Sequence, residues 1–149
     1  MSASNAFEAL ILSLIFENAN AANIGDATGL RGSTTPGVFY IGLHTADPGE
    51  AGAQNTSEAT YTGYARVSVA RSTAGWTVTG TAPTTVANDS TVTFGACSAG
   101  SSSCTHFSIG SDASGAGNLF MAGALTGTLA VSAGVTPSFA AGALTATFD

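Results

Sequence analysis

The chain has 149 residues, of which 44% are hydrophobic and 8% are charged, and its formal net charge at pH 7 is −6. Its three basic side chains, all arginines, cannot neutralise a run of phosphates, which argues against sequence-independent binding to nucleic acid. The apolar content argues against a disordered chain, and this length can bury a core without a metal or disulfide framework.

The N-terminal segment is predicted to form one helix near residues 5–17. Asn5 and Glu8 have the spacing of a capping box, with Ser4 as a competing cap. Apolar side chains then recur at helical spacing and predict a packed stripe: Phe7, Leu10, Ile11, Leu14 and Ile15. Leu12 and Phe16 lie off that stripe, so a second face of the helix is also apolar.

Two interpretations fit this second apolar face. The helix is either clamped between a sheet and a loop of its own chain, or shared with another subunit. For the second case we expect oligomer or docking contacts at Phe7, Leu10, Leu12 and Phe16. Burial would contribute about 1.5–3 kcal/mol for each such side chain.

The most apolar stretch, residues 9–16, is too short to span a bilayer, and no Lys or Arg precedes it as in a signal peptide. We therefore expect no membrane insertion, and synthesis in the cytoplasm of a bacterial host.

From about residue 37 the chain is rich in Val, Ile, Thr and aromatic residues, many at alternate positions. Strands are predicted over residues 38–43, 64–70, 75–80, 90–94, 105–109, 118–125 and 143–148. Residues 133–142 contain Pro137 and are predicted as a loop or an edge. The sequence predicts an all-β fold, an antiparallel β-sandwich (jelly-roll or Ig-like) with one N-terminal helix. We divide it into a helix and linker arm, 1–36, and a sandwich domain, 37–149, with the single Trp76 in its core.

The densest polar cluster contains His44, Asp47 and Glu50 at three-residue spacing. Imidazole and carboxylates could hold a divalent cation. However, Asp47-Pro48-Gly49 is also a turn signal, in which the aspartate caps the turn and Glu50 is solvated. We favour the turn, and expect no bound metal and no cofactor.

Cys97 and Cys104 flank residues 98–103, which are predicted to form a small flexible loop between two strands. If the flanking strands pair symmetrically, the two cysteines stand opposite one another, within reach of a disulfide. A disulfide and two free thiols both remain open.

Catalytic motifs are not found in this sequence. The two histidines, His44 and His106, have no G-x-S-x-G nucleophile turn to serve, and without Lys there is no phosphate-binding loop of the P-loop type. A hydrolase acting on cell-surface polymer would need paired carboxylates at a cleft, and no segment clearly offers them. We therefore expect no enzymatic activity.

Several segments together resemble a known family: residues 4–16 (SNAFEALILSLIF), 43–52 (LHTADPGEAG), 61–67 (YTGYARV), 105–110 (THFSIG) and 136–144 (TPSFAAGAL). They are similar to small bacteriophage virion proteins that are often labelled as tail fibre proteins. The resemblance implies a non-enzymatic structural component of the virion.

The location in the virion is a separate question. A fibre that reaches a host needs a long repetitive shaft, which 149 residues do not provide. A surface rich in small residues can pack closely against neighbours with little loss of side-chain entropy. We therefore expect a capsid decoration (cement) protein that forms a homotrimer and docks on a larger virion protein such as the major capsid protein. The alternative is a tail or tail-fibre component that anchors a fibre or contributes to host attachment.

Overall fold

The computed structural model describes residues 3–80 and 84–148, in which the chain forms one helix and nine strands. The chain divides into two compact units. The helical unit comprises the described residues of 1–37, 70–92 and 139–149, and the sheet unit comprises residues 38–69 and 93–138. The N-terminal helix thus shares a unit with two later segments, a grouping that a division at residue 36 does not anticipate.

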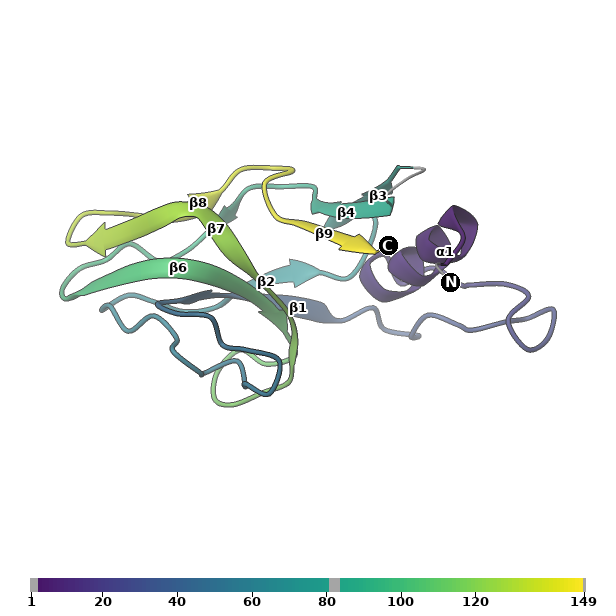
Figure 1. Cartoon of the computed structure of the whole chain (residues 1–149), viewed down its shortest axis with the longest axis horizontal. Helices are drawn as coiled ribbons and strands as arrows, with labels where there is room; N and C mark the ends of the chain where they lie inside the picture. Colours follow the sequence, from purple (N-terminus) through teal and green to yellow (C-terminus); the bar gives the residue numbers. More distant parts are fainter. Residues whose placement is uncertain (1–2, 81–83, 149) are drawn as a thin grey trace. The chain divides into compact units, whose positions relative to one another are not determined.

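The helical unit packs α1 (Asn5–Phe16) against a three-stranded antiparallel sheet (Figure 1). The strand order is β3 (Trp76–Thr79), β4 (Thr84–Asn88) and β9 (Thr145–Phe148). Large apolar side chains from all parts of this unit form its core: Leu12, Phe16, Trp76, Val86 and Leu144. Trp76 is fully buried, as predicted, but it lies in the core of the helical unit, against Phe16, and not in that of the sheet unit.

The helix begins at Ser4, whose hydroxyl accepts a hydrogen bond from the backbone N–H of Phe7 at 3.4 Å. Ser4 is therefore the N-cap, and the capping box at Asn5 was the wrong choice between the two candidates. At the other end, the guanidinium of Arg71 donates hydrogen bonds to the carbonyl oxygens of Leu14 (2.6 Å) and Ile15. A cation at this position satisfies carbonyls that the last helical turn leaves open.

The sheet unit is built on a four-stranded sheet. Its order is β2 (Val67–Ala70), β1 (Val38–His44), β6 (Ser101–Gly110) and β7 (Leu119–Ser132). β6 pairs antiparallel with β1 and with β7, and the long strands β6 and β7 run side by side (Figure 1). Because β7 is last in this order, one of its two edges is not paired within the sheet. The remaining strands, β5 (Val92–Thr93) and β8 (Ser138–Phe139), form a two-stranded pair.

The predicted fold class is confirmed: the chain is mostly β, antiparallel and sandwich-like, with one N-terminal helix. Two local predictions were wrong. Residues 101–103 belong to strand β6 rather than to a flexible loop, because they pair with residues 130–132 of β7. Strand β4 was not predicted. Within the described residues, no helix is long and apolar enough to cross a membrane.

Candidate functional site

The face of α1 that packs against the sheet of the helical unit is the opposite of the one predicted to do so. The residues of α1 that are buried inside the helical unit are Glu8, Leu12 and Phe16, which are 2%, 2% and 1% exposed. The ring of Phe16 lies edge-on to Trp76, with 4.9 Å between ring centroids. Leu12 and Phe16 are therefore core residues, and their assignment as docking contacts is corrected.

The expected packed stripe of α1 is instead its more accessible side. Phe7 and Ile15 are 43% and 37% exposed, while Leu10, Ile11 and Leu14 are half-buried. Of the four expected contact residues, Phe7 and Leu10 thus remain available to a partner. Within α1 the sole charged residue, Glu8, is buried, so this accessible side is uncharged.

Cys97 and Cys104 are both buried as free thiols. The predicted hairpin that would have placed them opposite one another does not form. Cys104 pairs with Leu129 across the β6–β7 ladder, and the backbone N–H of Cys97 donates to the carbonyl of Val135 at 2.9 Å. Burial raises the pKa of the Cys104 thiol above its ordinary value, which keeps it protonated and unreactive.

His44 and the acidic turn that follows it have separate environments. The His44 ring is fully buried and uses both nitrogens: Nδ1 donates to the carbonyl of Thr56 at 2.8 Å, so Nε2 accepts from the hydroxyl of Ser108 at 2.7 Å. Asp47 instead accepts a hydrogen bond from the backbone N–H of Gly49 at 2.9 Å, and Gly49 has φ +70°. This is the predicted Asp-Pro-Gly turn. Among the described residues, no three His, Cys, Asp or Glu side chains are grouped to hold a metal ion.

An ion pair between the buried Arg66 and the half-buried Glu58 is the centre of the polar network in the sheet unit. Arg66 donates to both carboxylate oxygens of Glu58, from Nε at 2.6 Å and from Nη2 at 2.8 Å. Tyr64 donates its hydroxyl to the same carboxylate at 2.9 Å and accepts from the backbone N–H of Leu43 at 3.0 Å. Burial raises the pKa of the Tyr64 phenol well above its ordinary value, so the hydroxyl remains a donor.

The same arginine fixes the loop between β6 and β7. Its Nη1 and Nη2 donate to the backbone carbonyls of Asp112 and Gly115, at 2.8 and 2.7 Å. Backbone carbonyl groups are present in every loop whatever its side chains, so the contact of Arg66 with this segment could not be predicted from the sequence.

Gln54 joins the loop that follows β1 to the loop between β6 and β7. It is fully buried, its side-chain Oε1 accepts from the backbone N–H of Asp112 at 2.9 Å, and its backbone N–H donates to the carbonyl of Ala116 at 2.7 Å. A Cβ on Gly110 would lie 2.2 Å from Cδ of Gln54, so a glycine is needed for this close contact. The two loops are therefore held as one rigid surface at the ends of the strands.

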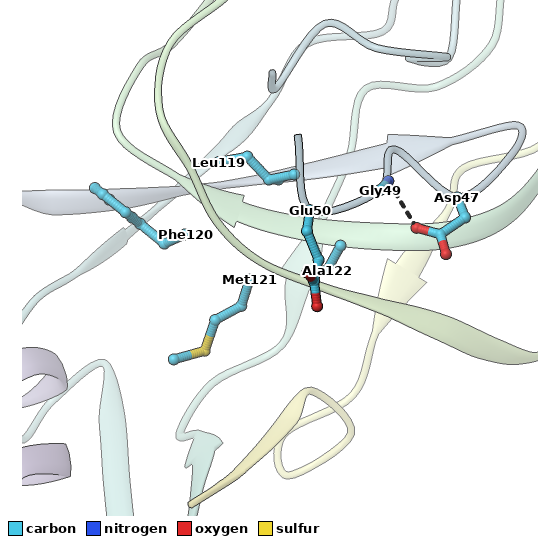
Figure 2. Close-up of a pocket in the computed structure, with 7 residues that line it drawn as sticks. All are labelled: Asp47, Gly49, Glu50, Leu119, Phe120, Met121 and Ala122. Atoms are coloured by element: carbon cyan, nitrogen blue, oxygen red, sulfur yellow. Dashed lines mark hydrogen bonds between the residues drawn. The ribbon is translucent and has the colours of Figure 1, made fainter. Parts of the chain in front are cut away.

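A pocket of about 380 Å³ lies where this surface meets the start of β7 (Figure 2). Its lining residues come from the acidic turn and the strand: Asp47, Gly49, Glu50, Leu119, Phe120, Met121 and Ala122. The side chain of Glu50 extends past Ala122 (Figure 2). Phe120 is 51% exposed and lies edge-on to Phe39, with 5.8 Å between ring centroids. The pocket thus combines two carboxylates with an apolar strand.

Comparison with known proteins finds a matching family. The family model described as podophage GP4 fiber I protein gp80 matches residues 2–147 of the chain. No curated protein sequence matches it. The match confirms the resemblance to phage tail-fibre-like proteins that the sequence motifs indicated.

Proposed function

We propose, from the premise that this chain belongs to the family of the podophage GP4 fiber I protein gp80, that it is a structural component of a phage tail fibre. The family match itself supports the broader statement that the chain is a phage virion structural protein. The observation that carries the finer proposal is the extent of the match, which runs over residues 2–147 and includes both compact units.

The fibre role replaces capsid decoration as our preferred function. The missing shaft and the surface rich in small residues, which favoured a capsid site, are equally compatible with a fibre component that is not itself the shaft. A chain of this kind fits the base or the joint of a fibre, where a compact module anchors a longer partner. The family description names a fibre protein, and this supports the fibre over the shell.

We propose a non-enzymatic role for the chain. A serine next to a histidine can act as a nucleophile when a substrate reaches it. Ser108 and His44 form such a contact, at 2.7 Å, but both residues are 0% exposed. The contact therefore supports the fold, and its enclosure supports a structural function.

We further propose that the protein is a homo-oligomer, a trimer, that contacts copies of itself through the accessible side of α1. This side offers Phe7, Leu10 and Ile15 and carries no charge, so acidic chains can approach there without bringing carboxylates together. Light scattering of the purified protein should give three times the mass of one chain, and Phe7→Glu should reduce it. A wild-type protein that is monomeric at all concentrations would refute the trimer.

The fibre assignment is tested by imaging phage particles that carry a labelled copy of this chain. We expect the label at the tail, at the positions where fibres join it. A label spread over the faces of the head would restore the capsid-decoration role and reject the fibre.

A further inference from the structure

The outer edge of β7 is open for pairing where the pocket begins. Residues 121–124 of β7 pair in unbroken register with residues 106–109 of β6. Among the described residues, the hydrogen bonds of residues 119–124 go to β6 alone. The outward N–H and C=O groups of an edge strand are a template onto which another extended segment can add.

The pocket beside this strand has an acidic rim, and no Lys or Arg is among its lining residues. Asp47 and Glu50 are exposed at the pocket, and in the described residues the one ion pair is that between Arg66 and Glu58. Arg71 is engaged with carbonyl groups of α1. The chain contains no lysine, so its own side chains are poorly able to neutralise the rim.

We propose that the outer edge of β7, at residues 119–124, binds an extended segment of a different protein, one whose Lys or Arg side chains reach the acidic turn 47–50 across the pocket that residues 119–122 line. The segment adds to the sheet as a further strand, and its basic side chains meet Asp47 and Glu50. Side chains of a strand alternate between faces, so basic residues at alternate positions fit best. The proposal rests on the proposed function, which supplies a neighbouring virion protein as the partner.

Charge decides between this partner and a second copy of the chain. A second copy could bring Arg31 alone, because Arg66 and Arg71 are engaged within the fold. It would also bring nine carboxylates to an acidic rim. A basic segment of another protein gains attraction at both carboxylates, and Phe120 provides an apolar contact beside them.

The rigid loops make this edge and its pocket a defined site. Arg66 and Gln54 hold residues 112–116 in place by hydrogen bonds to their backbone, so β7 starts from a fixed position. The turn at Asp47 is likewise closed by its bond to Gly49. A site that is already formed loses little conformational freedom when the partner binds.

The test uses the full chain and a short synthetic peptide in which Lys alternates with Thr. We expect binding by calorimetry, weaker in high salt, and slowed amide hydrogen exchange at residues 119–124 measured by NMR. The double variant Asp47→Asn, Glu50→Gln should bind about fivefold more weakly, because each exposed ion pair contributes modestly. Asp26→Asn, an exposed acidic residue of the helical unit, is the matched control and should bind as the wild type does.

A second peptide, methylated on alternate backbone nitrogens, separates strand addition from simple charge attraction. Strand addition requires those N–H groups, so this peptide should not bind. Equal binding of both peptides would overturn the proposal, as would unchanged exchange at residues 119–124. If the neutralised double variant self-associates and the wild type does not bind the peptide, the acidic turn instead prevents copies of the chain from pairing at the β7 edge, and the proposal is overturned.

In phage particles, a chain with Asp47→Lys and Glu50→Lys should be absent from purified virions, while a chain with Asp26→Lys should be incorporated. If both variants are incorporated at the tail, the proposal for the β7 edge fails and the fibre role stands. If the wild-type chain is itself missing from the tail, the proposed function fails.

Discussion

Two phenylalanines on one helix give the sharpest test of how α1 packs. Phe16 is 1% exposed and contacts Trp76 edge-on, whereas Phe7 is 43% exposed on the opposite side. Replacing a core Phe by Ala costs about 3–5 kcal/mol, because apolar surface is lost and a cavity remains. For Phe7, part of whose ring already contacts water, the loss should be about 1 kcal/mol.

Urea unfolding of Phe16→Ala and Phe7→Ala, followed by far-UV circular dichroism at a protein concentration at which light scattering finds single chains, measures this difference. We expect a large drop of the urea midpoint for Phe16→Ala and a small drop for Phe7→Ala, with similar slopes. Trp76 fluorescence should shift to the red in native Phe16→Ala alone, since its ring loses that neighbour. Equal losses, or a larger loss for Phe7→Ala, would refute the packing direction of the helix.

Three further predictions concern the sheet unit. Burial lowers the folded-state pKa of His44 below its ordinary value near 6.5, so the unfolded chain binds the proton more readily than the folded one. The stabilisation should therefore be complete above pH 6.5, and the free energy of unfolding should fall below that pH by up to about 1.4 kcal/mol per pH unit. His44→Gln should lose this pH dependence in urea titrations. Removing Arg66 leaves Glu58 without its cation, so Arg66→Met should cost about 3 kcal/mol in thermal unfolding, and adding Glu58→Gln should recover part of that loss. Cys97 and Cys104 should react with a thiol reagent on unfolding and not before, with unfolding unchanged by a reductant; a native protein whose stability falls on reduction would contradict the free thiols.

The helix shows what the sequence can and cannot predict. Its place and length followed from spacing and capping residues, and the observed helix, Asn5–Phe16, agrees with them. Its direction of packing did not follow, because apolar side chains lie on all sides of it. The row that packs against the sheet is Glu8, Leu12 and Phe16, because Phe16 contacts Trp76, a residue far along the chain.

For the strands too, local sequence predicts some elements, and distant pairing partners determine the others. Segments rich in Val, Ile and aromatics were predicted well, whereas Ser101–Ser103 was predicted as a loop because serine has little preference for strands. Those serines are strand because β7 pairs with them. The rigid loops of the candidate site were beyond prediction, since Arg66 binds backbone carbonyls of residues 112 and 115 that any sequence would provide.

The number of copies of this chain in each virion tests the central claim most directly. Quantitative mass spectrometry of purified particles, with heads and tails separated, measures it against the major capsid protein. A tail-fibre component should be present in a few to a few dozen copies and should remain with the tail fraction. Hundreds of copies that remain with emptied heads would contradict the fibre role.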